Sequence, residues 1–199
     1  MKKAKNYVLA ILLGVFIGCL TLIGQKYLPN NLKFLSNSGA VWLVPAFLVS
    51  YLSKSSKKSS IALCVIFLFF CVNSYYVFES IMNNHGFAFS KWQVVWNLMA
   101  VIAGSIFGLG AYFANRENGI VKYFGMNLLP AVFFSEGLQQ IINIGEYIHM
   151  IPATIMITSI GLIMYFAINR KGCFKKYNML SFAILSIIGL VGYLLLNII

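Results

Sequence analysis

Residues 61–78 read IALCVIFLFFCVNSYYVF, a run of eighteen residues without one charged side chain. A helix of this length, at about 1.5 Å per residue, covers most of the roughly 30 Å hydrocarbon core of a bilayer. Six similar apolar runs flank it, and the predicted spans are 7–24, 39–52, 61–78, 92–114, 123–142, 148–168 and 179–198. The pattern predicts an all-α, polytopic transmembrane helix bundle forming one integral membrane domain over 1–199. It has about seven spans, or six if one segment does not cross.

The composition agrees with a chain whose main solvent is lipid. Of the 199 residues, 60% are hydrophobic and 10% are charged, whereas about 25% of the residues of an ordinary soluble domain carry charge. Too little polar material is present to cover a globular surface in water. The composition therefore excludes a soluble enzyme, a secreted disulfide scaffold and a nucleic-acid-binding domain. It predicts the lipid bilayer as a partner and no nucleic acid.

The positive charges are distributed unevenly over the predicted loops. The chain has 15 Lys and Arg against 4 acidic residues, a formal net charge of +11. Twelve of the cations precede the first span or follow the second, fourth and sixth, and the remaining three are Lys26, Lys33 and Lys91. Short cytoplasmic loops carry an excess of Lys and Arg. We therefore predict a multi-pass protein of the plasma membrane with its N-terminus in the cytoplasm and its C-terminus outside.

The second predicted span, 39–52, is the shortest and contains Pro45. Two alternatives remain open for it. The span begins earlier, near Phe34, or it is a re-entrant segment, since irregular backbone at membrane depth is tolerated only inside protein or beside water. A segment that did not cross would place the basic clusters on opposite faces, which argues for a full span.

The usual signals of membrane enzymes are missing from the sequence. The chain has no Asp, no glycine-rich phosphate loop, no GxSxG and no HExxH, and these motifs carry the nucleotide, nucleophile and zinc chemistry of many enzymes. The four Cys residues show neither a CxxC nor a zinc-type Cys/His spacing. We therefore expect no cofactor, no metal and no catalytic residue. The sequence favours a protein that is not an enzyme, without deciding the question.

A polar stripe in the fifth predicted span is the main functional signal. Its first four members, Glu136, Gln139, Gln140 and Asn143, are spaced at i, i+3, i+4 and i+7, which places them on one face of a helix. Counting about 1.5 Å per residue from Lys122 puts the first carboxylate about 21 Å into the membrane, in its outer half. The candidate substrate-binding residues are Glu136, Gln139, Gln140, Asn143, Glu146 and His149.

Several interpretations of this stripe remain open. A carboxylate facing lipid costs about 2 to 3 kcal/mol or more, so Glu136 should face the bundle interior or a water-filled cavity. A cavity there would suit a small polar or cationic solute. Alternatively, the amides are hydrogen-bonding contacts between helices or part of a subunit interface. Glu146 and His149 alone do not predict a metal site, because no third ligand is evident.

Small residues recur every fourth position in two spans, at Gly14 and Gly18 and at Ala100, Gly104 and Gly108. Such rows allow helix backbones to approach closely. They predict close packing within the chain or against another membrane subunit.

Short motifs along most of the chain resemble an uncharacterised family of small bacterial multi-pass membrane proteins. They are Gln25, Gly39-Ala40-Val41-Trp42, Tyr75-Tyr76, the run 104–110, and Pro130 followed by Glu136-Gly137. The resemblance implies a bacterial plasma membrane and names no substrate.

Three function classes follow from these observations. The first is a solute-binding or transport component with an outward-facing polar pocket at the stripe. The second is a non-enzymatic structural, immunity or regulatory protein acting through a membrane partner. The third is a membrane enzyme acting on lipid-linked substrates with Glu and His as acid and base.

Overall fold

The computed structural model describes residues 2–83, 90–116, 119–169 and 175–196. Within these ranges the regular structure is helical, as predicted. The helices are α1 (Lys2–Tyr27), α2 (Lys33–Asn37), α3 (Gly39–Ser53), α4 (Lys57–Met82), α5 (Lys91–Arg116), α6 (Ile120–Ile142), α7 (Ile144–Tyr147), α8 (Ile151–Ile168) and α9 (Lys176–Leu196), with a short 3-10 turn at Ile148–Met150.

Six segments of the described chain are long and apolar enough to cross a membrane. They are Ala4–Tyr27, Lys33–Ser53, Lys57–Met82, Lys91–Asn115, Ile148–Ile168 and Lys176–Leu196. The fifth predicted span forms the 23-residue helix α6 but is not among these six. Its mean hydropathy is lowered by the polar residues along it, most of which are buried against other helices. The chain is a polytopic, multi-pass membrane protein by its helices, with α6 enclosed among them.

The second span is longer than its apolar core suggests, and it is broken. It starts at Lys33, next to the predicted earlier start near Phe34, and the helix is interrupted at Ser38, whose φ of −68° and ψ of 124° are extended. α3 then continues through Pro45 to Ser53. The greater part of this span, 15 of its 21 residues, is therefore a helix that begins inside the bundle.

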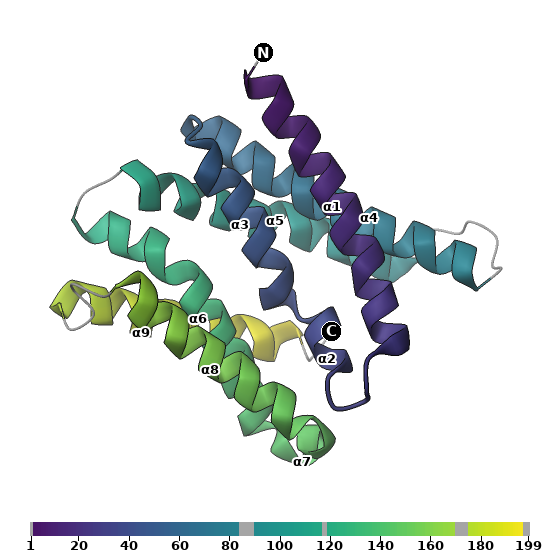
Figure 1. Cartoon of the computed structure of the whole chain (residues 1–199). Helices are drawn as coiled ribbons and strands as arrows, with labels where there is room; N and C mark the ends of the chain where they lie inside the picture. Colours follow the sequence, from purple (N-terminus) through teal and green to yellow (C-terminus); the bar gives the residue numbers. More distant parts are fainter. Residues whose placement is uncertain (1, 84–89, 117–118, 170–174, 197–199) are drawn as a thin grey trace.

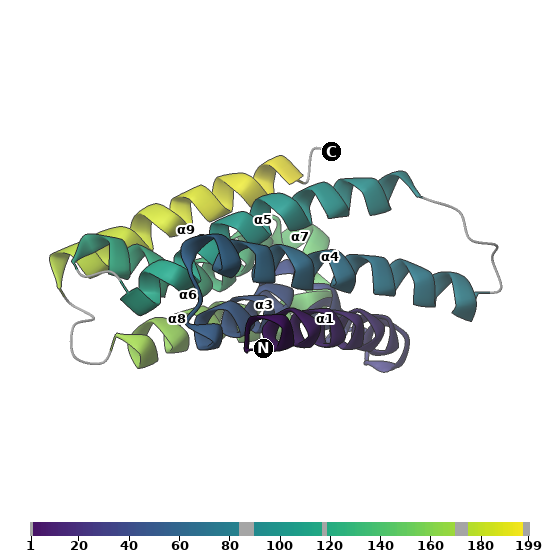
Figure 2. The same cartoon turned by 90° about the horizontal axis from the view of Figure 1, so that it is seen from above.

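The long helices form two groups of three that pack mainly within themselves (Figures 1 and 2). In the first group α4 lies between α1 and α5, and in the second group α6 lies between α8 and α9. The groups meet where α5 packs against α6. α3 packs on α4 and α5 and also reaches α6, so that it lies at the junction of the two groups.

Glycines set the close packing of the first group. A Cβ added at Gly104 of α5 would lie 2.7 Å from the Cα of Val65, and one at Gly108 would lie 2.6 Å from the Cα of Ile61, both on α4. Gly14 and Gly18 of α1 approach the α4 backbone on its other side in the same way. The predicted small-residue rows are thus used inside the chain, where they hold α1 and α5 against α4.

The core of the first group is apolar and centres on α4, where Leu63, Cys64, Phe67 and Cys71 are buried. Exposed apolar side chains cover the outer faces of the long helices, among them Leu12, Leu98 and Ile187. The outer faces are therefore apolar, unlike the more polar surface of a soluble protein, which agrees with contact to lipid.

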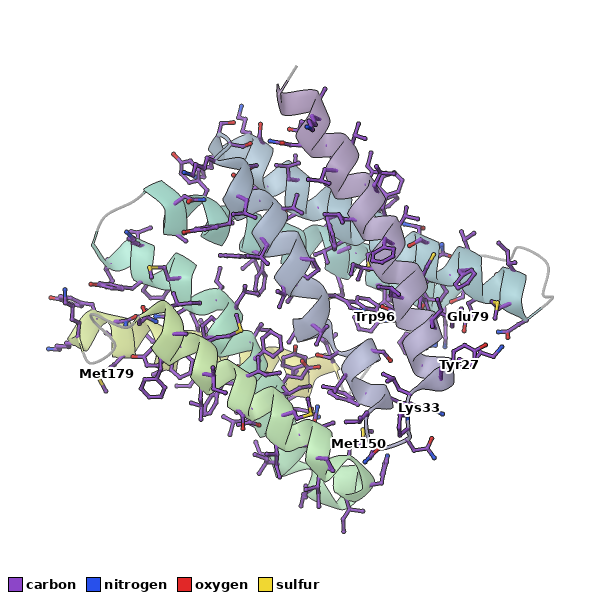
Figure 3. The ribbon with its side chains drawn as sticks, in the orientation of Figure 1. Tyr27, Lys33, Glu79, Trp96, Met150 and Met179 are labelled. Atoms are coloured by element: carbon purple, nitrogen blue, oxygen red, sulfur yellow. The ribbon has the colours of Figure 1, made fainter. Side chains whose placement is uncertain are left out.

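Two ends of the bundle are visible in Figure 3. The labelled residues Tyr27, Lys33, Glu79 and Met150 lie toward one end, and Met179 lies at the opposite end. The predicted topology makes the end with Glu79 the outer one. The orientation in the membrane stays a prediction.

Candidate functional site

The buried polar face of α6 holds three of the six predicted site residues. Glu136, Gln139 and Gln140 are 3%, 5% and 0% exposed. Asn143, which ends α6, is partly buried, and His149 lies exposed in the 3-10 turn. Glu146 lies on α7, and its side chain is outside the described part of the structure. The predicted stripe therefore divides into a buried triad, Glu136, Gln139 and Gln140, and three residues at the end of the bundle.

The carboxylate of Glu136 receives hydrogen bonds at the break in the second span. The Ser38 hydroxyl donates to its Oε2 at 2.7 Å, and the backbone N–H of Ala40 donates to the same oxygen at 3.2 Å. The backbone of Gly39 and the side chain of Tyr193, on α9, also hydrogen-bond to it. Glu136 thus joins α6 to the start of α3 and to α9.

The physical reason for this contact is the buried beginning of α3. The first N–H groups of a helix have no partner within the helix, and its N-terminus carries partial positive charge. Ser38 caps one of these groups, because its Oγ accepts from the N–H of Val41 at 3.2 Å. The Glu136 carboxyl oxygen accepts from another, the N–H of Ala40. The interaction satisfies a carboxylate and a helix N-terminus that are both removed from water.

Gln140 and Gln139 are incompletely satisfied. The Thr154 hydroxyl of α8 donates to Oε1 of Gln140 at 2.6 Å. The amide nitrogens of Gln139 and Gln140 are buried and have no hydrogen-bond partner among the described residues. Buried amide donors without a partner are uncommon and costly, and they are the groups that a bound polar molecule would engage.

Polar contacts continue along α6 toward its beginning. The side-chain amide of Asn127 donates to Oδ1 of Asn178 and to Oγ of Ser181, both at 2.7 Å, and its oxygen accepts from Asn169 at 3.0 Å. Directly before the triad, Ser135 donates to the carbonyl of Ser186 on α9 at 2.8 Å. These bonds hold α8 and α9 against α6.

Several of these residues were not predicted from the sequence. Ser38 carried a usable signal, because Ser directly before an apolar run is a common helix N-cap. Asn127 is a lone polar residue in the same span as the stripe. Tyr193 carried no distinguishing signal, since tyrosine is common near the ends of membrane helices.

Two hollows occur elsewhere on the molecule. One, of about 380 Å³, lies between α4 and α5 and is lined by residues that include Glu79, Trp92 and Trp96. The other, of about 350 Å³, is an apolar groove along α8 lined mainly by isoleucines of α6, α7 and α8. The buried triad lines neither of them. In the described ranges no three His, Cys, Asp or Glu side chains converge as metal ligands would.

Comparison with protein families gives one match. The model described as "Family of unknown function (DUF6518)" matches residues 1–199. The chain belongs to this family, which agrees with the predicted membership of a family without known function. Neither the curated proteins nor the solved structures contain a match.

Proposed function

We propose that this member of the family DUF6518 is a solute-binding or transport component of the plasma membrane, with the buried triad as its polar centre. The observation that carries the proposal is the contact between Glu136 and the buried start of α3. Asn143, Glu146 and His149 follow the triad in the sequence, toward the end of the bundle that the charge distribution places outside.

Broken helices of this kind are found where transporters bind ions and small solutes. Half-helix termini present free backbone groups at membrane depth, and those groups bind substrates. Here the position at the start of α3 is filled by a side chain of the protein itself. A small polar or cationic solute with N–H donors could replace Ser38 and Ala40 on the carboxylate. Its acceptors would then meet the amide nitrogens of Gln139 and Gln140, which have no partner among the described residues.

The position of the contact suits a change of shape. Glu136 belongs to the second group of helices, while α3 packs on α4 and α5 of the first group. Exchanging the Glu136 contact for a solute would loosen the junction between the two groups. Movement of one helix group against the other around a fixed site is how many transporters alternate access.

The test is uptake by cells. Cells that express the full chain are compared with empty-vector cells for accumulation of isotope-labelled amino acids, polyamines and betaines. We expect at least one solute to accumulate, and Glu136→Gln and Gln140→Ala each to lower its uptake by about tenfold or more, because each removes a group that contacts it. Immunoblots of the membrane fraction correct for the amount of protein. Glu117→Gln is the matched control, since it makes the same change at a glutamate outside the triad.

A second candidate is favoured by the fact that Glu136 already has partners in the chain. If the carboxylate serves only to cap α3, Glu136→Gln lowers thermal stability while Gln140→Ala leaves all uptake unchanged. That result would favour a structural or regulatory protein that acts through a membrane partner. Unchanged uptake in both variants would contradict the transport proposal.

A further inference from the structure

The hollow between α4 and α5 lies outside the buried triad and has a different chemistry. Its volume of about 380 Å³ is within the range of small-molecule sites. The lining residues combine aromatic rings with one carboxylate and are Tyr75, Tyr76, Glu79, Trp92, Gln93 and Trp96, with serines at 80 and 90. A cavity of this size suits a small organic molecule and is too large for a bare ion.

Helical spacing explains how these side chains meet. Tyr75 and Glu79 are four residues apart on α4, and Trp92 and Trp96 are four residues apart on α5. Residues at i and i+4 share one face of a helix. Since α4 and α5 pack closely, the two faces oppose each other near the end of α4 and the beginning of α5. Figure 3 labels Glu79 and Trp96 in this part of the molecule.

The rings of Tyr75 and Trp96 are held in place by neighbouring side chains. The Tyr75 hydroxyl donates to Oε1 of Gln25 at 2.9 Å, and its ring lies edge-on to that of Tyr76 with centroids 5.2 Å apart. The ring of Trp96 makes an edge contact with Trp42 at 6.2 Å. These contacts fix the aromatic surface before any ligand arrives, and a preformed site loses less entropy on binding.

Gln93 is fixed in the same way, and it forms part of the wall. Its amide donates to Oδ1 of Asn73 at 2.9 Å, and Asn73 in turn donates to Asn97 at 2.8 Å. The amide of Gln93 is therefore committed to the helix interface. The carboxylate of Glu79 remains as the charged group of the hollow.

Glu79 is partly buried and makes no ion pair within the described ranges. At the same end, the ammonium of Lys91 lies 5.4 Å from the centre of the Trp92 ring. The chain's own cation thus already uses one face of this aromatic surface. Aromatic faces attract ammonium groups through their quadrupole, and sites for methylated ammonium are built from several such rings.

We propose that this hollow binds an alkylammonium group. The Glu79 carboxylate counters the charge, and the rings of Trp92, Trp96 and Tyr76 contact the methyl or methylene groups. The site is independent of the proposed function, because it uses α4 and α5 and none of the residues of α6. An aromatic belt at the membrane surface would also place Trp and Tyr at this level. A belt explains neither the shared hollow nor the carboxylate among the rings.

The same chemical group occurs on free amines and betaines and on the choline or ethanolamine headgroup of a phospholipid. The experiment separates these sources by the choice of membrane. The full chain is placed in nanodiscs of phosphatidylglycerol, which carries no amine, and choline chloride is the probe. Sodium chloride at equal ionic strength and the uncharged carbon isostere of choline are the chemical controls.

Tryptophan fluorescence is a direct readout, because the chain has 3 Trp. Two of them line the hollow, and the third, Trp42, contacts Trp96. We expect a saturable change in emission with choline and none with the isostere. Glu79→Gln should weaken the apparent affinity about tenfold, as should Trp92→Leu, whereas Glu117→Gln should leave it unchanged.

A lipid source gives a different result. Replacing phosphatidylglycerol by phosphatidylcholine would then change the emission of the wild-type chain but not of Glu79→Gln, and free choline would have no further effect. The proposal is overturned if neither choline nor phosphatidylcholine changes the emission. It is also overturned if the isostere acts like choline, or if Glu79→Gln and Trp92→Leu, both folded by circular dichroism, respond like the wild type.

Discussion

The central helices of the two groups, α4 and α6, occupy corresponding places, and what they bury differs. α4 lies between α1 and α5, which approach its backbone through glycines and enclose apolar side chains such as Leu63 and Phe67. α6 lies between α8 and α9 and is joined to them by hydrogen bonds of Asn127, Ser135 and Gln140. Glycines bring helices close together in both groups, since Gly161 of α8 approaches the backbone of α6. The difference lies in the centre of each group, which is mainly apolar around α4 and rich in buried polar side chains around α6.

The difference bears on function. Close backbone packing has one good arrangement, because any shift opens gaps or creates clashes. Hydrogen bonds between side chains can be exchanged for bonds to a solute at small net cost. Under the transport proposal, the polar centre around α6 is therefore the part of the molecule expected to respond to a solute, and the first group is the frame on which α3 rests.

The strongest way to break the comparison is to enlarge a glycine of the first group. Gly104→Leu places a side chain where a Cβ alone would lie 2.7 Å from the Cα of Val65. We expect a loss of more than about 4 kcal/mol of folding free energy and no monodisperse protein in size-exclusion chromatography. Gly192→Leu on α9 is the control, since the described structure leaves open space around that position. Equal behaviour of the two variants would refute the steric fit.

The next largest effect is expected at the polar junction. Glu136→Ala removes the acceptor of the Ser38 hydroxyl and of the Ala40 N–H, which leaves a donor at the buried start of α3 without its partner. The expected loss is about 2 to 4 kcal/mol, measured as a lower thermal midpoint in detergent. Glu136→Gln keeps an acceptor oxygen and should lose about half as much. A midpoint for Glu136→Ala equal to that of the wild type would show that α3 does not depend on the carboxylate.

A smaller effect is expected at the beginning of α6. Asn127→Ala removes contacts to Asn178, Ser181 and Asn169. Interhelical hydrogen bonds in membranes average about 0.6 kcal/mol each, so the expected loss is about 1 to 2 kcal/mol in urea- or heat-induced unfolding. Cys64→Ala on α4 serves as the apolar counterpart and should cost less than about 1 kcal/mol, because only a small side chain is shortened. A larger loss of stability at Cys64 than at Asn127 would contradict the contrast between the polar contacts of α6 and the apolar contacts of α4.

The smallest effect on stability is expected where a functional effect is proposed. Gln140→Ala loses the bond from Thr154, and it also removes a buried amide nitrogen that has no described partner. The loss of the hydrogen bond and the removal of the buried nitrogen oppose each other, so the free energy of unfolding, measured by thermal unfolding, should change by less than about 1 kcal/mol. A marked loss of stability would instead show that Gln140 serves to pack α6 against α8.

The helices were predictable because apolar length is a local property. The run 61–78 lies inside α4, and 92–114 lies inside α5, with only the ends extended. The polar stripe on α6 was also predictable, because i, i+3 and i+4 spacing fixes a shared face. That Glu136 faces the bundle interior follows from the cost of exposing a carboxylate to lipid, and its exposure of 3% confirms this.

The partners of that carboxylate were not predictable, because they depend on contacts between distant segments. Ser38 and Glu136 are 98 positions apart, and nothing local to either residue specifies the other. The glycine rows illustrate the same limit. Their spacing predicts close packing, but only the structure shows that α4 fills both rows and that they are not available to another subunit.

The distance in sequence between α3 and Glu136 also bears on how the protein is made. The acceptor for the Ala40 N–H emerges from the ribosome 96 residues after its donor, about 5 to 20 s later at ordinary rates of synthesis. Until then the Ala40 N–H at the start of α3 lacks this acceptor. The second segment is therefore expected to wait near the membrane surface or beside the insertion machinery. It would become a stable span only when α6, the fifth predicted span, has been made. The second crossing of the membrane is therefore expected to be completed after the fifth predicted span has been synthesised.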